Sequence, residues 1–354
     1  MHVCTLVGAR PQFVKAAAVS PALKEAGIKE TLIHSGQHYD ELLSQVFFDE
    51  LGVPPPISNL EVGSGSHAVQ TGEIMVRLEQ FIKETGPYDA VIVYGDTNTT
   101  LAGALVAAKG NIPLAHVEAG VRSFNWLMPE EINRILTDRV SKWLFAPTET
   151  AAENLEREGL KENTILVGDV MLDATHMFAE RAKKLFPLKS ITRHNSGGYC
   201  LATVHRPSNT DIRENLQSIF SAFGQLPLPV ILPLHPRTNA VLGHITVPDN
   251  VEIIPPVSYL TMLTLTSNAH RVLTDSGGLQ KEAYWFGVPC IILREETEYP
   301  ETFENNWSVC AGANQKTIIN AAMGTPTGPQ CRLGEGPEGR AATMIAQGLL
   351  RGIN

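Results

Sequence analysis

Short runs of apolar residues recur along the whole chain, and each gives way to polar or glycine-rich residues and then to a helical stretch. The runs occupy residues 3–7, 31–34, 91–94, 143–146 and 165–167 in the first half, and 199–204, 230–232, 251–254, 271–273 and 290–293 in the second. Uninterrupted apolar runs are typical of parallel strands buried on both faces. Their alternation with helical segments predicts strand–helix–strand units and an α/β fold with doubly wound parallel sheets.

The same strand–helix rhythm occurs in both halves, which predicts two domains in this chain of 354 residues. The polar segment 187–198 contains proline, serine and glycine and separates the two halves as a linker would. We therefore expect one Rossmann-like domain over residues 1–186 and another over residues 187–339, with a cleft between them. A last helix is expected from about residue 340 to residue 350.

Composition and charge limit the classes of partner. Apolar residues make up 43% of the chain and charged residues 18%, as in soluble globular proteins, and the net charge of -9 argues against nucleic acid or an acidic membrane surface. No apolar run approaches the ~20 residues of a membrane helix, and no signal-peptide pattern opens the chain. The five cysteines are scattered without a Cys-x-x-Cys pair, which favours reduced thiols and a cytoplasmic protein.

The segment from Thr274 to Glu282 carries the clearest binding pattern. An apolar run ends there, Ser276 can cap a following helix, and Gly277 and Gly278 allow positive φ and a close approach of backbone to a ligand. Free N–H groups at a helix start, together with the helix dipole, form an anion site that commonly takes phosphate. Glu282 lies further along the helix and could accept hydrogen bonds from a ribose. The structural alternative is a capped strand–helix junction with glycines for packing.

Three carboxylates follow strand ends in the first half. Asp96 comes after the run 91–94, and Glu118 after a strand that ends at residue 117. Glu130 opens a helix behind Pro129 and shares a helix face with Arg134, four residues on. Helix capping is the structural alternative for Asp96 and Glu130. If they converge, however, clustered carboxylates raise one another's pKa and can exchange protons near neutral pH. No metal-ligand spacing accompanies them, so we expect no metal.

Basic residues also follow strand ends. Arg10 and Lys15 stand at the first strand–helix turn, where they could meet an anion or be solvated helix-start charges. His205 and Arg206 follow the first strand of the second half, a combination that suits a diphosphate. His235 stands at the next strand end, and as an isolated loop histidine it has the weakest case. The first turn lacks the full Gly-x-Gly-x-x-Gly pattern, which argues against a dinucleotide cofactor.

In order along nearly the whole chain, these motifs resemble those of the non-hydrolysing UDP-N-acetylglucosamine 2-epimerases. The matching residues are Gly8-Ala9-Arg10-Pro11, Lys15, Gly36-Gln37-His38, Gly95-Asp96-Thr97, His116-Val117-Glu118-Ala119-Gly120, Pro129-Glu130-Glu131-x-Asn133-Arg134, His205-Arg206, Asp275-Ser276-Gly277-Gly278 and Glu282. The resemblance implies a GT-B fold of two Rossmann-like domains, a homodimer, and a last helix that crosses back to the first domain. It implies an isomerase that inverts C2 of a UDP-linked 2-acetamido sugar through UDP elimination and re-addition, without metal or nicotinamide.

The resemblance also implies roles for the candidate residues. Asp96, Glu118 and Glu130 would be the acids and bases. Diphosphate binding or stabilisation of the departing UDP would fall to Arg10, Lys15, Arg134, His205 and Arg206. In the second half, Ser276, Gly277 and Gly278 would take phosphate, Glu282 the uridine ribose, and His235 the substrate side.

Departures from the family pattern concern the sugar. Tyr299 stands where many members carry an arginine, and variants at 123–125 and 296–298 look more like the branch that includes 2-epimerases of UDP-2,3-diacetamido-2,3-dideoxyglucuronic acid, which serve O-antigen or capsule synthesis. We expect UDP-N-acetylglucosamine, converted to UDP-N-acetylmannosamine, as substrate, with the diacetamido sugar as alternative. A GT-B glycosyltransferase, a hydrolysing epimerase and a non-catalytic nucleotide-sugar sensor remain alternatives of other classes.

Overall fold

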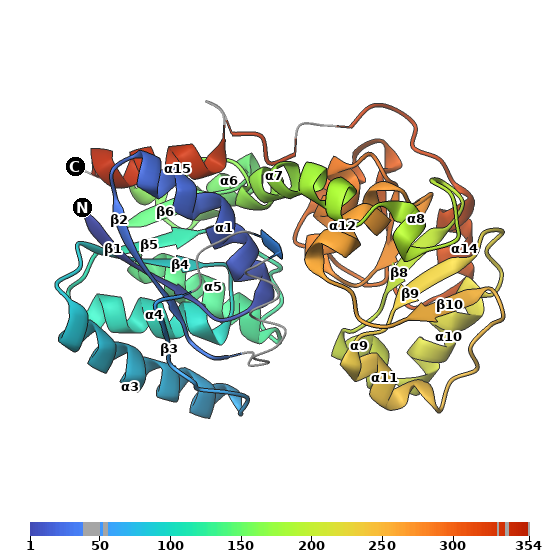
Figure 1. The fold of residues 1–354 in the computed structure, drawn as a ribbon, viewed down its shortest axis with the longest axis horizontal. Helices are drawn as coiled ribbons and strands as arrows, with labels where there is room; N and C mark the ends of the chain where they lie inside the picture. Colours follow the sequence, from blue (N-terminus) through green and yellow to red (C-terminus); the bar gives the residue numbers. More distant parts are fainter. Residues whose placement is uncertain (38–49, 52–55, 331–332, 337–339, 353–354) are drawn as a thin grey trace. The chain divides into compact units, whose positions relative to one another are not determined.

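Two parallel β-sheets organise the chain, and each carries helices on both faces (Figure 1). The computed structural model describes residues 1–37, 50–51, 56–330, 333–336 and 340–352. By its internal contacts the chain divides into residues 1–174 with 334–354, called unit 1, and residues 175–333, called unit 2. The division falls inside a helix, ahead of the segment 187–198 that composition indicated as a linker. His38, which belongs to one of the matching motifs, lies outside the described residues.

Unit 1 contains a seven-stranded sheet in the order β3-β2-β1-β4-β5-β6-β7. The strands are β1 (His2–Val7), β2 (Lys29–His34), β3 (Ser58–Asn59), β4 (Ala90–Tyr94), β5 (Leu114–Val117), β6 (Trp143–Ala146) and β7 (Thr164–Leu166). The helices are α1 (Arg10–Glu25), α3 (His67–Thr85), α4 (Asn98–Lys109), α5 (Pro129–Val140), α6 (Glu149–Arg157), α15 (Ala341–Arg351) and α7 (Val170–Leu185), which continues into unit 2, with a 3₁₀ turn at Lys161–Asn163.

The apolar runs of unit 1 became strands because both faces of the sheet are covered. Leu6, Val91 and Val93 pack with Ile74 and Leu78 of α3 in one fully buried cluster. On the other face α15 lies beside α1, as the position of the two helices in Figure 1 shows. The last helix therefore belongs to the first unit, although it follows unit 2 in sequence.

Unit 2 contains a six-stranded sheet in the order β10-β9-β8-β11-β12-β13. Its strands are β8 (Cys200–Thr203), β9 (Val230–Pro233), β10 (Val251–Ile254), β11 (Arg271–Thr274), β12 (Cys290–Ile292) and β13 (Ser308–Cys310). Its helices are α8 (Leu188–Ile191), α9 (Pro207–Thr210), α10 (Arg213–Phe223), α11 (Pro236–Leu242), α12 (Tyr259–Ser267), α13 (Gly277–Trp285) and α14 (Gln315–Met323), with 3₁₀ turns over Pro300–Asn306.

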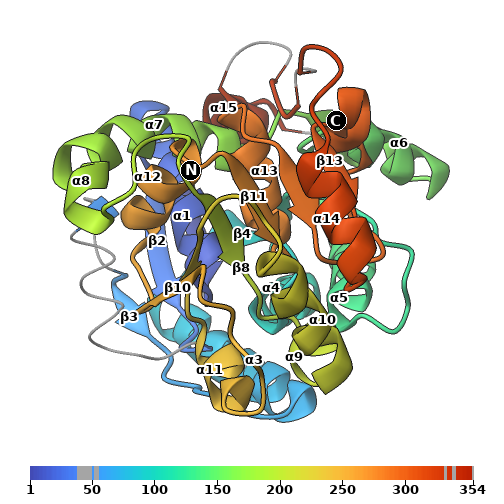
Figure 2. The ribbon, with the colours of Figure 1, turned by 90° about the vertical axis from the view of Figure 1, so that its right-hand side faces the viewer.

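Two layers of helices cover the second sheet as well. Phe220 and Phe223 of α10 join Ile318 of α14 on one face, and the two helices lie side by side in Figure 2. Leu265 of α12 and Ala283 of α13 pack on the other face. Every strand pairing in both sheets is parallel, so the predicted doubly wound α/β fold is confirmed.

A glycine at the end of β7 accommodates the returning C-terminal segment. Gly168 has φ +94°, and a Cβ built there would lie 2.6 Å from the Gly336 nitrogen and 2.8 Å from the Gly334 oxygen. The Gly168→Ala variant therefore has to displace the segment that leads to α15, besides adopting a strained backbone. We expect its free energy of unfolding to fall by about 2–4 kcal/mol, measured by denaturant titration of unit 1 fluorescence and by calorimetry.

The matched control is Gly159→Ala. Gly159 also has positive φ, +76°, but a Cβ there meets nothing within 4 Å. Only backbone strain is added, and a loss of about 1 kcal/mol is expected. Equal losses in the two variants would show that contact with residues 334–336 contributes nothing.

Candidate active site

The topological switch point of each sheet lies between its first and fourth strands in sequence. In unit 1 these are β1 and β4, and in unit 2 they are β8 and β11. Open α/β sheets bind ligands outside the carboxyl ends of the strands at this point, because loops there diverge to opposite faces. The predicted residues follow these strands or their neighbours in both units.

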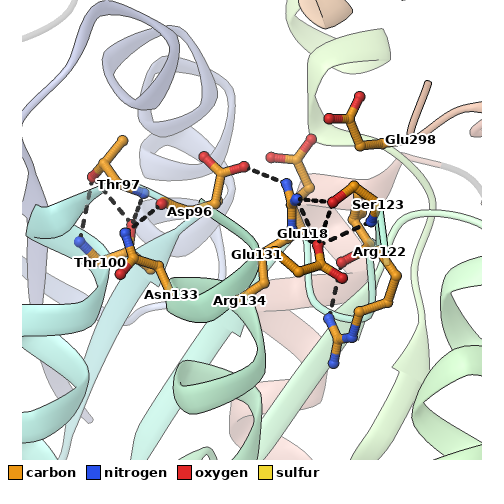
Figure 3. A network of polar contacts seen from close by, with 12 residues as sticks. Asp96, Thr97, Thr100, Glu118, Arg122, Ser123, Glu131, Asn133, Arg134 and Glu298 are labelled. Atoms are coloured by element: carbon orange, nitrogen blue, oxygen red, sulfur yellow. Dashed lines mark hydrogen bonds and ion pairs between the residues drawn. The ribbon is translucent and has the colours of Figure 1, made fainter. Parts of the chain in front are cut away.

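Asp96 lies just beyond β4 and forms an ion pair. Thr97, not Asp96, caps α4, because its hydroxyl accepts from the Thr100 N–H. The prediction that Asp96 could cap this helix is thus wrong, and its carboxylate makes a different contact. Oδ2 accepts from the Arg134 guanidinium at 2.6 Å (Figure 3), and the Arg134 side chain is 4% exposed while that of Asp96 is 35% exposed.

Glu118 lies at the end of β5, the strand next to β4, and forms an ion pair with Lys15 of α1. Glu118 has φ +73°, a left-handed conformation that is uncommon for a residue with a side chain. Gly95 makes room for the pair: with φ +63°, a Cβ there would lie 3.3 Å from both the Glu118 Oε2 and the Lys15 Nζ. Such strained positions persist where surrounding contacts hold them, and they occur often at functional sites.

The carboxylates of unit 1 are close enough to influence one another. Partial burial raises the pKa of Asp96; the charges of Arg134 and Lys15 oppose the shift, and those of Glu118 and Glu130 add to it. Glu130, the second residue of α5, is half-buried. Asp96, Glu118 and Glu130 are therefore brought together, with Arg134 and Lys15 among them. Arg10 opens α1 at the end of β1 and is exposed.

Glu131, which the sequence did not single out, anchors the loop before α5. Its carboxylate accepts from the backbone N–H of Ser123 and of Phe124, both at 2.9 Å, and from Arg134 at 2.7 Å (Figure 3). Burial opposes ionisation, but these donors outweigh it and lower the pKa of Glu131. Two adjacent glutamates at a helix start look alike in sequence, and only the loop shows which one turns inward.

In unit 2, Asp275 organises the turn that carries the predicted diphosphate residues. This fully buried carboxylate accepts from the backbone N–H groups of His205 and Arg206 at 2.9 Å, and lies 3.1 Å from the His205 Nδ1. Burial lowers the pKa of His205, and nearby arginines add to this while Asp275 opposes it. His235 is exposed, but its ring lies 5.2 Å from the His205 ring, so this histidine is not isolated.

The segment after β11 forms the expected helix start. Ser276 caps α13 by accepting from the Leu279 N–H, and Gly277 and Gly278 are the first two helical residues. Neither glycine has positive φ in the described backbone, so this turn does not use that freedom of glycine. Close approach is what Gly277 permits: a Cβ there would lie 3.1 Å from the Tyr299 ring. Glu282 is 5% exposed, and burial raises its pKa to about 7.

The candidate residues are thus divided between the two units. Unit 1 holds Arg10, Lys15, Asp96, Glu118, Glu130 and Arg134, and unit 2 holds His205, Arg206, His235, Ser276, Gly277, Gly278 and Glu282. None of the helices in the described part of the chain is both long and apolar enough to cross a membrane.

Comparison with known proteins identifies related sequences. The family model described as UDP-N-acetylglucosamine 2-epimerase matches residues 21–328. A UDP-N-acetylglucosamine 2-epimerase homolog of Methanococcus maripaludis is 48% identical over 90% of this chain and 91% of its own length. The UDP-2,3-diacetamido-2,3-dideoxy-D-glucuronate 2-epimerase of Pseudomonas aeruginosa is 45% identical over 91% of both chains.

A solved structure is similar over nearly the whole length. The UDP-GlcNAc 2-epimerase of Methanocaldococcus jannaschii, crystallised in complex with UDP-GlcNAc and UDP, is 39% identical with a TM-score of 0.89, covering 99% of this chain and 100% of that one. Together with the two Rossmann-like sheets, this likeness confirms the GT-B fold.

Proposed function

Because this chain belongs to the UDP-N-acetylglucosamine 2-epimerase family, we propose that it inverts C2 of a UDP-linked 2-acetamido sugar without releasing the free sugar. The observation that carries the proposal is the pair of carboxylates at neighbouring strand ends. Asp96 is paired with Arg134, and Glu118 with Lys15. A carboxylate beside a cation can hold or give up a proton as the surrounding charge changes during reaction.

The proposed reaction has two halves. A carboxylate removes the C2 proton, the C–H electron pair forms a C1–C2 double bond, and the bond from C1 to the UDP oxygen breaks. A second acid then delivers a proton to the other face of C2, and UDP re-forms its bond to C1. Asp96, Glu118 and Glu130 are the proposed acids and bases. The cationic side chains of Arg10, Lys15 and Arg134 would stabilise the negative charge of the departing diphosphate.

UDP binding is assigned to unit 2. The N–H groups of Gly277 and Gly278 and the hydroxyl of Ser276 lie at the start of α13, where phosphate is favoured by unpaired N–H groups and the helix dipole. His205 and Arg206 would contact the diphosphate, His235 the substrate side, and Glu282 the ribose hydroxyls. The relative from M. jannaschii, crystallised with UDP-GlcNAc and UDP, supports this class of ligand.

We propose UDP-N-acetylglucosamine as substrate, with UDP-N-acetylmannosamine as product. The second candidate is UDP-2,3-diacetamido-2,3-dideoxyglucuronic acid. The P. aeruginosa relative, which is named as a 2-epimerase of this sugar nucleotide, is 45% identical to the chain. A feature of unit 2 bears on the choice: Tyr299 packs against Gly277, and its ring lies 4.5 Å from the Lys281 ammonium. Where many family members carry a flexible, charged arginine, this chain therefore has an aromatic ring.

Proton NMR in D₂O tests the function directly. Incubation with UDP-N-acetylglucosamine is expected to give deuterium at C2 and a growing UDP-N-acetylmannosamine signal. Exchange seen only with the diacetamido sugar would assign the second substrate. Free N-acetylmannosamine with stoichiometric UDP would indicate a hydrolysing epimerase. UDP release that requires an acceptor would indicate a glycosyltransferase, and UDP binding without exchange on either sugar would indicate a sensor.

We also propose a homodimer, on the basis of an apolar stripe on α5. Ile132, Leu136 and Val140 recur every four residues and are 40%, 45% and 38% exposed. A row of large apolar side chains on one helix face is typical of a protein–protein interface. In the loop before this helix, Trp126 and Leu127 are also exposed, at 67% and 93%.

The dimer predicts a clear effect of one charge in the stripe. The Leu136→Glu variant is expected to be monomeric by size-exclusion chromatography with light scattering, because an interface cannot bury an unpaired carboxylate without cost. The control is Met323→Glu on α14 of unit 2, which replaces another exposed apolar side chain and is expected to leave the dimer intact. A Leu136→Glu dimer would place the interface elsewhere.

A cytoplasmic location is proposed from the thiols. Cys4, Cys200, Cys290 and Cys310 are free in the described chain. Burial raises the pKa of Cys200 to about 11, so this thiol is held as an unreactive core group. Reduced structural thiols of this kind are typical of reducing compartments.

A further inference from the structure

The turn that carries Asp96 is held by an unusual series of side-chain donors. The Tyr94 carbonyl accepts from the Gln12 Nε2 at 2.7 Å and from the Thr100 Oγ1 at 2.6 Å. The Gly95 carbonyl lies 2.7 Å from the His116 Nε2, and the Asp96 carbonyl accepts from the Asn133 Nδ2 at 2.9 Å. Three successive carbonyls are therefore bound by side chains from α1, α4, β5 and α5.

His116 connects this turn to a buried charge. Its Nδ1 lies 2.6 Å from the Asp138 Oδ1, and both side chains are fully buried. The Gly95 carbonyl can only accept, so the Nε2 must donate to it. Burial opposes ionisation of Asp138, but His116 and Arg122 outweigh it and lower the pKa of that carboxyl. The imidazole therefore bridges the Gly95 carbonyl and the Asp138 carboxylate, one through each ring nitrogen.

The same carboxylate holds the turn that carries Glu118. The Asp138 Oδ2 accepts from the Gly120 N–H at 3.1 Å and from the Arg122 guanidinium at 2.7 Å. Glu118 adopts left-handed backbone two residues before that bond. Asp138 thus reaches the Glu118 turn directly and the Asp96 turn through His116.

We propose that His116 and Asp138 are positioning residues that fix the Asp96 turn relative to the Glu118 turn. The inference rests on the proposed epimerase function, in which these two carboxylates act on one carbon atom. Neither His116 nor Asp138 is exposed, so neither can touch a ligand, and both act through the turns. Acid–base groups must be held to within a fraction of an ångström, and a displacement of about 1 Å can slow a reaction about 100-fold.

Two substitutions at His116 separate positioning from general stability. In His116→Gln the amide nitrogen replaces Nε2 and can still donate to the Gly95 carbonyl. In His116→Asn the shorter amide replaces Nδ1 and can reach only Asp138. Both variants remove the imidazole from the buried pair, so a purely structural role predicts similar activities at a temperature where both are folded.

Positioning predicts that His116→Asn lowers kcat and the rate of C2 deuteration about 10–100-fold, while His116→Gln retains at least several-fold more activity. UDP affinity, measured by calorimetry, should stay within about twofold in both, because neither substitution alters a side chain that is proposed to contact UDP. Asp173→Asn is the control: that half-buried carboxylate of unit 1 accepts from the Ala342 N–H, away from both turns. It should lower stability with kcat unchanged.

A further variant keeps the test open if neither His116 variant folds. Asn133→Leu removes the donor to the Asp96 carbonyl without stranding a buried charge, and a 10–100-fold fall in kcat is again expected. Equal activity of His116→Asn and His116→Gln, or of Asn133→Leu and the wild type, would overturn the inference. If the wild type itself produces no C2 exchange, the proposed function fails instead. Nuclear magnetic resonance then tests the bridge alone: a hydrogen-bonded proton on the His116 Nε2, protected from exchange, supports it, and a freely exchanging one overturns it.

Discussion

Replacing Asp96 by asparagine is expected to slow C2 deuteration and epimerisation about 1000-fold, because proton transfer by a positioned carboxylate contributes roughly 10²–10⁴ to a rate. The asparagine oxygen can still accept from Arg134, so the 2.6 Å contact seen with the carboxylate need not be lost. What disappears is the ability to take and return a proton. The measurement is proton NMR in D₂O, with initial rates at saturating UDP-sugar.

The control for this variant is Asp89→Asn, just before β4. The Asp89 carboxylate accepts from the His2 N–H at 2.6 Å, at the opposite end of the strand from Asp96. Its replacement should leave the rate within about twofold of the wild type, and UDP affinity should be unchanged in both variants. Asp96→Asn turning over at half the wild-type rate would remove Asp96 from the acid–base set and leave Glu118 and Glu130 as the candidates.

Replacing Glu282 by glutamine is expected to stabilise the unliganded protein at high pH. Burial raises the pKa of Glu282 from its ordinary value of 4.5 to about 7. Folding therefore favours the protonated form, and ionisation of this group is disfavoured in the folded state. The penalty is absent below pH 4.5, grows through pH 7, and reaches about 3 kcal/mol above it. Glutamine mimics the neutral acid, so its advantage over the wild type should grow by that amount from pH 4.5 to pH 8.

The Glu282→Gln substitution should also weaken UDP binding. The carboxylate whose ionisation destabilises the unliganded protein is the group that we propose to bind the ribose. A carboxylate can accept from both ribose hydroxyls, whereas glutamine offers one oxygen. Loss of a hydrogen bond to a charged group costs about 1.5–3 kcal/mol, so affinity should fall at least 10-fold at pH 8. Calorimetric titration with UDP and thermal melts across pH 4.5–8 measure both effects.

The exposed Glu214 on α10 supplies the control for Glu282. Glu214→Gln should change neither the pH dependence of the melting temperature nor the affinity for UDP. A Glu282→Gln variant that is stabilised at pH 8 but binds UDP as tightly as the wild type would leave Glu282 as a buried acid without a ligand. Unchanged stability at both pH values would show that water reaches the carboxylate.

The sequence by itself determined the α/β class, the number of sheets, and the strand ends that carry chemistry. A strand buried on both faces must be apolar throughout, so β4 and β6 could be identified directly from their composition. Helix starts after strands were equally readable, and Ser276 caps α13 as its residue type indicated. The two-residue strand β3 and the partly buried β13 gave no such signal.

Only the tertiary structure decided which side chains meet. Asp96 and Arg134 are 38 residues apart and pair because the first turns of α5 lie at the carboxyl end of β4. Nothing in the sequence around Asp138 indicates a function. Its connection to the Asp96 and Glu118 turns depends on contacts with His116 of β5 and with Gly120 in the loop that follows. Glu130 and Glu131 differ only in the direction that the loop before α5 imposes. The local pattern of apolar and polar residues specifies helices and strands, because secondary-structure propensity and burial act over a few residues. Hydrogen bonds at the edge of the sheet join residues that can be any distance apart in sequence, so the local pattern does not specify them.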